Sequence, residues 1–478
     1  MAIKRVSPVD TAWLLIENRD TPMHVGALLE FTKPDGAEPD YLGRQLERMR
    51  EERRIPRPWN LRPVNAPLVG PRVPLMSEDT DIDLSYHVRH LALPQPGGQR
   101  ELGILISRLH SHQLDMHRPL WEMHLIEGLG ENGFAMYMKI HHSLIDGVSG
   151  MKLLLKTLSA DPDGGDTPAF WTVGEGSKPG KPVDEIESSE PAGSVVGSVV
   201  ESAVAGASTV TGLGRAALEL GASRIREGDL AVPYDAPDSA LGGRLGGQRR
   251  FATQQYDLEE MKSLAKASGG TLNDIVLYLS SSALRRYLKE HGVLPSRSLT
   301  AGIPVSLREA GDESTGTSVC IVVTELATNY GDPRERLEAI QASMSEAKNH
   351  VHSLPPAAKE SYTLLLNAPF ITSLLAGLGG RTPVPFNVTV SNVPGPSEPL
   401  YFSGSRLDRL SPLSLLPHGT ALNITCVSYA GTMNFGLTGA RDSLPHLQRL
   451  AIYMGEELEL LKEVLLEPAA SPKKQKQG

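Results

Sequence analysis

The chain has 478 residues, with 47 Lys and Arg against 56 Asp and Glu, which gives a formal net charge of −9. This length predicts two or three domains. The negative charge argues against a general nucleic-acid binder, because such proteins need a basic surface to displace counterions. Hydrophobic residues at 40% and charged residues at 22% are typical of a globular protein and exclude wholesale disorder.

The chain also lacks the common marks of export or membrane insertion. Its two cysteines, Cys320 and Cys426, are too few for a disulfide framework and favour a reducing compartment. We expect no signal peptide, and no segment reaches the ~18 uninterrupted apolar residues that a spanning helix needs. The most apolar run, residues 364–378, is interrupted by polar residues and Pro369, so we interpret it as a buried helix or as one lying in a membrane interface.

Residues 1–160 form the first of three compositional regions. Strand-like runs at residues 24–31, 121–126 and 134–142 enclose helical runs at residues 41–52 and 100–111. Such alternation predicts an α/β layered domain.

Residues 161–249 differ in composition. Gly, Pro, Asp, Glu and Ser dominate residues 161–194, residues 195–226 show a helical period of small side chains, and residues 241–247 are rich in glycine. These patterns predict a linker or crossover that contains one or two helices.

Residues 250–467 return to an α/β pattern, and residues 468–478 are a basic tail that we expect to be disordered. The sequence predicts helices at residues 258–267 and 271–289. A short turn at Ala430-Gly431 predicts a hairpin. The strands predicted in this region are residues 250–256, 299–305, 318–326, 386–392, 422–429 and 432–437.

The segment FAMYMKIHHSLIDGVSGMKLLLKTL, residues 134–158, predicts a strand, a tight turn and a helix, with His141, His142, Asp146 and Gly147 at its centre. Side chains alternate between the two faces of a strand. His142 therefore continues an apolar face, whereas His141 continues a mixed one. If the apolar face lines a cavity, His142 meets an apolar substrate, and a neutral imidazole there suits a general base.

The other two motif residues have structural roles in this interpretation. Asp146 caps the following helix or pairs with an arginine, and so holds the turn that orients His142. Gly147 permits a backbone conformation or a close approach that a Cβ would block. Two alternatives are that the histidines are ordinary structural residues, or that they bind a metal. A metal site is disfavoured because adjacent strand residues point in opposite directions and no further ligand motif accompanies them.

The His-His-x-x-x-Asp-Gly pattern resembles the coenzyme-A-dependent acyltransferase superfamily, which includes chloramphenicol acetyltransferase, carnitine acyltransferases and peptide-synthetase condensation domains. Further motifs narrow the resemblance. In chain order they are PVDTAW, DTPMHVG, PLW, TLNDIVL, AGIPVSLR, SNVPGP and ALNITCVSYAGTMNFGLTG. Together they make the chain similar to the bacterial bifunctional wax ester synthase/acyl-CoA:diacylglycerol acyltransferase family, from about residue 7 to residue 466.

This resemblance implies an α/β fold of two similar chloramphenicol-acetyltransferase-like domains, with a substrate tunnel between them and His142 at its middle. It also implies transfer of a long-chain fatty acyl group from acyl-CoA to a long-chain alcohol or to diacylglycerol. Acyl-CoA is then a substrate, and neither a cofactor nor a metal is required. Distant relatives carry Asp-Phe-Gly where this chain has Asn434-Phe435-Gly436, so a role for that segment does not carry over.

Several other residues become candidates for the site. His141 would support His142. Asn273, in the Asn-Asp motif, is a candidate oxyanion donor or acceptor-positioning group, although Thr271, Asn273 and Asp274 are also helix-capping types. Candidate substrate-binding residues are Asp274, Ser391 and Asn392, the last two with a rigid turn as the alternative role.

Two other classes of function stay open from the sequence: the same fold acting on a soluble acceptor, and a non-catalytic lipid-binding protein. A zinc hydrolase is a more remote alternative. We expect a cytoplasmic protein that associates peripherally with the inner membrane face or with lipid inclusions, because its substrates are insoluble. The net negative charge argues against strong general attraction to anionic lipid.

Overall fold

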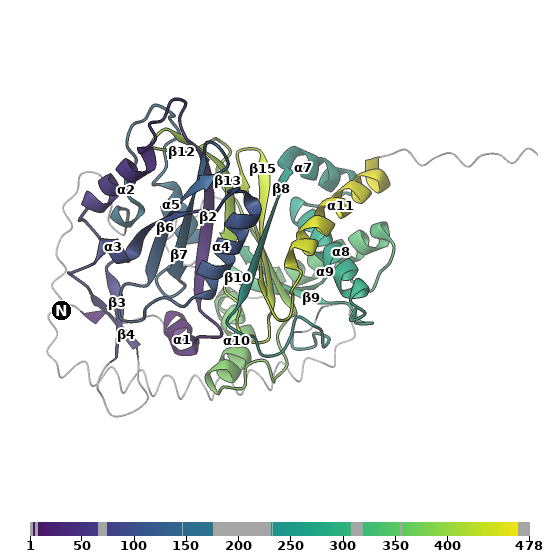
Figure 1. Cartoon of the computed structure of the whole chain (residues 1–478). Coiled ribbons are helices and arrows are strands. Elements are labelled where there is room, and N and C mark those ends of the chain that lie inside the picture. The colour runs from purple at the N-terminus through teal and green to yellow at the C-terminus, as the bar shows by residue number, and fades with distance from the viewer. Residues whose placement is uncertain are drawn as a thin grey trace, which may run out of the picture.

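The computed structural model describes residues 3–4, 8–65, 74–145, 147–174, 231, 233–306, 319–353 and 356–466. Two six-stranded mixed sheets form the centre of this part of the chain, each with helices beside it (Figure 1). The mixed α/β class expected from the sequence is confirmed. Within the described ranges, none of the helices combines the length and the apolar character needed to cross a bilayer.

The first sheet has the strand order β12-β13-β2-β7-β6-β5. Neighbouring strands are antiparallel except β5 and β6. The bounds are β2 (His24–Thr32), β5 (Val88–Ala92), β6 (Trp121–Leu129), β7 (Gly133–His141), β12 (Tyr401–Phe402) and β13 (Ser405–Leu413). A small separate sheet has the order β1 (Ile3–Lys4), β4 (Pro74–Glu78) and β3 (Leu61–Asn65).

Helices cover both faces of the first sheet. Apolar residues of α2 (Tyr41–Glu51), α5 (Gly147–Leu155) and the short 3-10 helix η1 (Phe170–Thr172) pack on one face. Those of α4 (Gln99–Ser111) pack on the other. The remaining helices of this half are α1 (Pro8–Ile16) and the single turn α3 (Leu84–His87).

The second sheet has the order β10-β9-β11-β14-β15-β8, with β11 parallel to both of its neighbours. Its strands are β8 (Arg249–Asp257), β9 (Thr300–Ser306), β10 (Val319–Glu325), β11 (Val388–Val393), β14 (Leu422–Tyr429) and β15 (Thr432–Ala440). The helices of this half are α7 (Leu258–Ala267), α8 (Leu272–Glu290), α9 (Pro333–Ser353), α10 (Pro356–Leu375) and α11 (Leu447–Leu466). Apolar residues of α7, α8, α9 and α11 share one core with this sheet.

Most strands and helices predicted from the pattern are confirmed, and so is the hairpin between β14 and β15. Its two turn residues, Ala430 and Gly431, have φ values of 44° and 81°, as a tight hairpin turn requires. The sequence pattern did not reveal β13 or the long helices α9 and α11, among other elements. The predicted helical segment 195–226 and the tail 468–478 lie outside the described residues.

The second half of the chain contributes two strands to the first sheet. Strands β12 and β13 come from the second half but complete the first sheet, where β13 pairs antiparallel with β2 from Leu413 opposite Gly26 to Arg406 opposite Thr32. A division of the chain at residue 250 therefore does not separate the two sheets. The alternation of β13 is interrupted by a register shift between Leu407 and Arg409, which hides it from a search for period-two patterns.

Serine hydroxyls of α4 also tie the first half to the edge of the second sheet. The backbone N–H of Arg249 donates to Ser111 Oγ at 2.8 Å, and that of Phe251 donates to Ser107 Oγ at 3.1 Å. An exposed sheet edge leaves backbone donors unpaired, and these hydroxyls satisfy two of them. The contacts place the start of β8 beside the C-terminal end of α4.

Candidate active site

His141 is the last residue of β7 and is buried, with 1% of its side chain exposed. The backbone N–H of Ser143 donates to its Nδ1 at 3.1 Å, and Ser143 Oγ lies 2.7 Å from the same nitrogen. Its Nε2 lies 3.4 Å from Oε2 of Glu17, whose side chain is 3% exposed. A buried carboxylate therefore faces the ring of His141.

His142 follows directly and has a different environment. Its backbone N–H donates to the carbonyl of Met23 at 2.9 Å, and its ring centre lies 4.8 Å from the Trp13 ring on α1. The residue is only partly buried, whereas His141 is almost inaccessible. Of the two histidines, His142 is therefore the one that a substrate can reach.

The apolar face of β7 is packed in the core, so the condition that it lines a cavity is not met among the described residues. Phe134, Met136, Met138 and Ile140 are all buried and belong to the core formed with α2 and α5. The helices α2 and α5 cover this face of the strand, which the alternation of residues along β7 does not reveal. The accessibility of His142 therefore comes from its place beyond the end of the strand, and not from the face that it continues.

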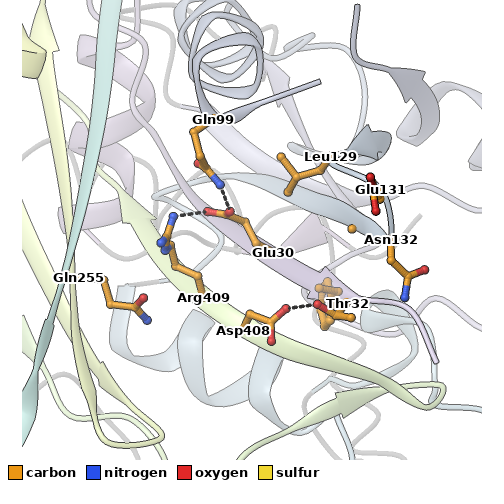
Figure 2. A pocket seen from close by; sticks show the side chains of 11 residues that line it. Glu30, Thr32, Gln99, Leu129, Glu131, Asn132, Gln255, Asp408 and Arg409 are labelled. Carbon is orange, nitrogen blue, oxygen red and sulfur yellow. Dashed lines mark hydrogen bonds and ion pairs between the residues drawn. The ribbon is translucent and has the colours of Figure 1, made fainter. Parts of the chain in front are cut away.

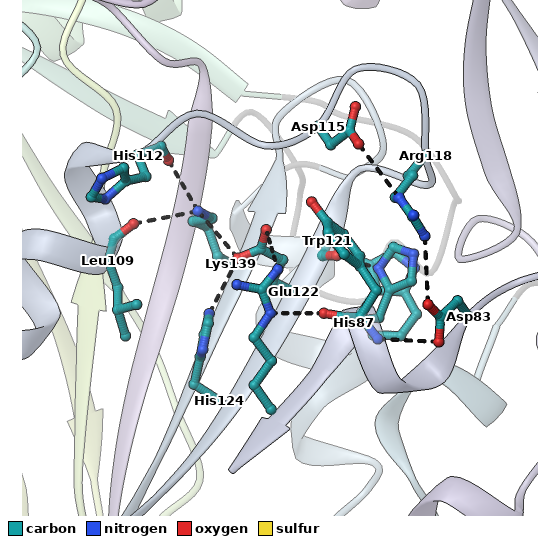
Figure 3. A network of polar contacts seen from close by, with 12 residues as sticks. Asp83, His87, Leu109, His112, Asp115, Arg118, Trp121, Glu122, His124 and Lys139 are labelled. Carbon is teal, nitrogen blue, oxygen red and sulfur yellow. Dashed lines mark hydrogen bonds and ion pairs between the residues drawn. The ribbon is translucent and has the colours of Figure 1, made fainter. Parts of the chain in front are cut away.

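The opposite face of the same strands carries a buried polar network (Figure 3). Lys139 Nζ donates to the carbonyls of Leu109 at 3.3 Å and His112 at 3.0 Å, and it lies 3.5 Å from Glu122 Oε2. Burial raises the pKa of Glu122, but a hydrogen bond with His124 and the neighbouring charges, chiefly that of Lys139, outweigh it and lower this pKa to about 2. The Glu122 carboxylate is therefore ionised at neutral pH.

Two further buried histidines lie close to the motif. His24 is opposite His141 in the pairing of β2 with β7, and its Nε2 lies 2.9 Å from the carbonyl oxygen of His110. His110 Nδ1 lies 2.8 Å from the Tyr137 hydroxyl. Burial lowers the pKa of His24 and lowers that of His110 to about 3, so both are neutral at pH 7. Their contacts indicate structural roles.

The Asn-Asp motif begins α8. Thr271 is its N-cap, and Asp274 Oδ2 accepts from the backbone N–H of Thr271 at 2.7 Å and from its hydroxyl at 2.8 Å. This reciprocal capping box occupies the carboxylate. Asn273 differs, because its Nδ2 is buried and has no hydrogen-bond partner among the described residues. Asn273 thus has a donor to offer, whereas Asp274 serves the helix.

Ser391 and Asn392 lie near the end of β11 and are partly buried. The Ser391 carbonyl accepts from the thiol of Cys426 at 3.5 Å. In the turn that follows, the Gly395 N–H donates to Ser428 Oγ at 3.1 Å, and a Cβ at Gly395 would overlap the carbonyl oxygen of Ser428. This glycine therefore allows the turn to pack closely on β14, and the substrate-binding role of Ser391 and Asn392 stays a prediction.

The last two residues of the motif are Asp146 and Gly147. Asp146 lies outside the described residues, so its predicted orienting role stays a prediction. Gly147 is the first residue of α5, which agrees with its place at the turn. Sequence reasoning missed Glu17, which contacts His141 and lies between the two quoted motifs PVDTAW and DTPMHVG. The signal that could have revealed it is a carboxylate placed directly after an apolar helix.

Two of the hollows in the described part of the chain lie near polar residues of the first half. One, of about 320 Å³, lies at the far end of β2, where Glu30 accepts from Gln99 Nε2 at 2.5 Å and lies 3.5 Å from Arg409 (Figure 2). The other has a volume of about 520 Å³, and two of its lining residues follow Glu17 closely along the chain. Its lining residues are Arg19, Asp20, Ser111, His112, Gln113, Gly247 and Gln248. His142 lines neither cavity, so the tunnel stays a prediction.

Among the described residues, His, Cys, Asp and Glu side chains form no group of three or more that could hold a metal ion. Burial raises the pKa of the Cys426 thiol well above its ordinary value, so this cysteine is a neutral core residue.

The motif geometry and the domain matches together decide the family. Residues 6–276 match the wax ester synthase/diacylglycerol acyltransferase catalytic domain, and residues 315–462 match the C-terminal domain of the same family. The chain belongs to the wax ester synthase/diacylglycerol acyltransferase family. The resemblance seen in the sequence is thereby confirmed, and this family member is an acyltransferase.

Relatives of this acyltransferase match along almost their whole length. A Mycobacterium tuberculosis protein named as a putative diacylglycerol O-acyltransferase is 41% identical over 96% of this chain and 97% of its own. The Acinetobacter baylyi O-acyltransferase WSD is 36% identical over 97% of this chain and 98% of its own.

Solved structures agree. The wax ester synthase/diacylglycerol acyltransferase of Marinobacter aquaeolei matches with a TM-score of 0.78 and 34% identity, over 97% of this chain and 99% of its own. A condensation domain of the calcium-dependent antibiotic synthetase matches with a TM-score of 0.58 and 18% identity, over 98% of this chain and 97% of its own. The second match shows the shared fold alone.

Proposed function

We propose that this acyltransferase moves a long-chain fatty acyl group from acyl-CoA to the hydroxyl of a fatty alcohol or of diacylglycerol, with His142 as the general base. The observation that carries the assignment of the base is the contrast within the motif. His141 is buried and hydrogen-bonded, whereas His142 is partly exposed beside Trp13. The names of the relatives support the choice of lipid acceptors.

The chemistry needs few groups because a thioester is already activated. His142 accepts the proton of the acceptor hydroxyl while the oxygen attacks the thioester carbonyl carbon. The tetrahedral intermediate then collapses with cleavage of the C–S bond, and the imidazolium of His142 returns the proton to the CoA thiolate. General acid–base catalysis of this kind contributes typically about 10²–10⁴-fold. The chain thus requires neither a cofactor nor a covalent enzyme intermediate in this proposal.

Asn273 is the second group in the proposed mechanism. Its buried Nδ2 lacks a hydrogen-bond partner among the described residues, and a buried donor without an acceptor is costly. An oxygen of the substrate would satisfy it. We assign this donor to the developing oxyanion or to the acceptor hydroxyl.

The first experiment measures free-thiol release from palmitoyl-CoA with hexadecanol, with dipalmitoylglycerol or with no acceptor, followed by lipid separation. Release that depends on the acceptor and yields ester supports the proposal, and the ratio of the two rates ranks the acceptors. His142→Ala is expected to abolish release while palmitoyl-CoA still binds, and His117→Ala, which changes an exposed histidine, serves as the matched control. Full turnover by His142→Ala would exclude His142 as the base.

Absence of ester with both lipid acceptors would favour the two other classes of function. Thiol release with a water-soluble alcohol or amine would then indicate an acyltransferase for a soluble acceptor. Binding of palmitoyl-CoA without any turnover would indicate a lipid-binding protein on this fold.

We also propose that the protein is cytoplasmic and associates peripherally with the inner membrane face or with lipid inclusions. Leu375 and Leu378, at the end of α10, are 49% and 46% exposed, and Leu15 on the neighbouring helix α1 is 48% exposed. The exposed side chains of Arg244 and Arg381 lie in the same region, since Arg244 approaches the carbonyl of Gly377 at 3.5 Å. Apolar side chains flanked by cations fit an anionic lipid surface.

Sedimentation with vesicles of phosphatidylcholine and phosphatidylglycerol tests this association. The wild-type protein is expected to pellet with the vesicles, and a Leu375→Ser/Leu378→Ser variant is expected to pellet less. Val293→Ser, which alters an exposed apolar residue elsewhere, is the control. Wild-type protein that stays in the supernatant would remove the proposal.

A further inference from the structure

Glu17 contacts His141 directly and is linked to His142 through the backbone of Met23. Its Oε2 accepts from the backbone N–H of Met23 and lies 3.4 Å from His141 Nε2. The carbonyl of Met23 in turn accepts from the backbone N–H of His142 at 2.9 Å. A single buried carboxylate oxygen therefore connects the side chain of one histidine to the backbone of the other.

The contacts of His141 also determine where its proton lies. A backbone N–H can only donate, so the Ser143 N–H requires a lone pair on His141 Nδ1. In the neutral ring the proton must then be on Nε2, the nitrogen that faces Glu17. Glu17 Oε2 lies 3.4 Å from that nitrogen without forming a hydrogen bond, and it places a negative charge beside the Nε2 proton. The environment thus selects one tautomer and one ring orientation of His141.

The same helix-to-strand segment holds the ring of His142. Trp13 on α1 lies against the His142 ring, and Glu17 follows that helix directly. Glu17 also anchors the loop before β2 through Met23, whose carbonyl fixes the backbone of His142. A change in the position of Glu17 would therefore move both the Trp13 ring that packs against His142 and the backbone of His142 itself.

We infer that Glu17 is a positioning residue for acyl transfer, which locks the tautomer of His141 and the backbone of His142 through Oε2. This inference rests on the proposed role of His142. Misplacement of a catalytic group by about 1 Å costs on the order of 10²-fold in rate. Glu17→Ala is therefore expected to lower kcat about 10- to 100-fold while KM for palmitoyl-CoA and hexadecanol changes less than about twofold.

Glu17→Gln separates the contact from the charge. Both contacts use Oε2, so the single amide oxygen of glutamine can accept from the Met23 N–H and face His141 Nε2 from the same place. We expect this variant to retain most of the wild-type kcat. Glu30→Gln removes another buried carboxylate at the far end of β2 and is the matched control, with an unchanged ratio of kcat to KM expected.

A double-mutant cycle with His141→Asn tests whether Glu17 acts through His141. If it does, Glu17→Ala lowers kcat by a smaller factor in the His141→Asn background than in the wild-type background, because only the route through Met23 is then left to lose. A merely structural glutamate would give additive losses in the cycle. Additive losses, or a Glu17→Ala enzyme with wild-type kcat, would overturn the inference.

The tautomer is measured without any turnover. In ¹⁵N spectra of histidine-labelled wild-type protein, the signals lost in His141→Asn identify His141, and they are expected to show a protonated Nε2 and an unprotonated Nδ1. A proton on Nδ1 would overturn the inference even if Glu17→Ala fails to fold. If wild-type protein makes no ester from any acceptor, the proposed function fails, whereas intact wild-type turnover with an insensitive Glu17→Ala variant refutes only the role of Glu17.

Discussion

Lys139 and Glu122 form a buried ion pair beside the histidine motif, and replacing Lys139 by methionine tests the polar network of Figure 3. The Lys139 side chain is 2% exposed and that of Glu122 is 8% exposed. Methionine fills a similar volume but leaves the Glu122 carboxylate with His124, which burial keeps neutral, and with the half-exposed Arg89. Breaking a buried pair from one side costs about 3–5 kcal/mol, so we expect a loss of that size at pH 7.

The pH dependence gives an independent magnitude. The pKa of Glu122 is about 2 in the fold and 4.5 in its ordinary state, a difference that corresponds to about 3 kcal/mol of stability at neutral pH. Because the pKa in the folded state is the lower one, this stability is present above about pH 4.5 and is lost as the pH falls towards 2. The difference between wild-type and Lys139→Met protein should therefore shrink between pH 5 and pH 2.

Urea unfolding followed by tryptophan fluorescence at pH 7 and at pH 3 measures both effects. Lys152→Met, which changes an exposed lysine on α5, should stay within about 0.5 kcal/mol of the wild-type protein. The double variant Glu122→Gln/Lys139→Met should be more stable than Lys139→Met alone, because no buried charge is left unpaired and Arg89 is half-exposed to solvent. A loss below about 1 kcal/mol for Lys139→Met at pH 7, or a difference that stays constant with pH, would refute the reasoning.

Four further outcomes are expected. Gly436→Ala should destabilise the protein by about 1–3 kcal/mol in urea unfolding, because the added Cβ would overlap the carbonyl oxygen of Pro412 on the neighbouring sheet; an unchanged midpoint would contradict this. Thr271→Ala should lower the free energy of unfolding by about 0.5–2 kcal/mol through loss of the α8 cap with Asp274, with kcat unaffected. Asn273→Ala should lower kcat about 10²–10³-fold with an unchanged unfolding midpoint if it donates to the oxyanion. Dialysis against a chelator should leave thiol release unchanged, and its loss, restored by a divalent metal, would overturn the metal-free mechanism.

Local patterns predicted much of the fold because they report on local burial. The periodicity of residues 271–289 predicted α8, and the Ala430-Gly431 turn predicted the β14–β15 hairpin. Neither result needs knowledge of what lies on the other side of the element. The strand β13 was missed because a register shift interrupts its alternation, and its pairing with β2 is selected only by packing between distant parts of the chain.

For the site, the sequence by itself determined the family and the histidine pair, since the motifs that carry both are contiguous along the chain. Only the tertiary structure decided which histidine is accessible and what orients it. The apolar face of β7 is covered by α2 and α5, which residue alternation cannot show. Glu17 meets His141 because α1 ends beside the end of β7, and a contact between such distant segments depends on the burial of whole elements and not on the pattern of either one.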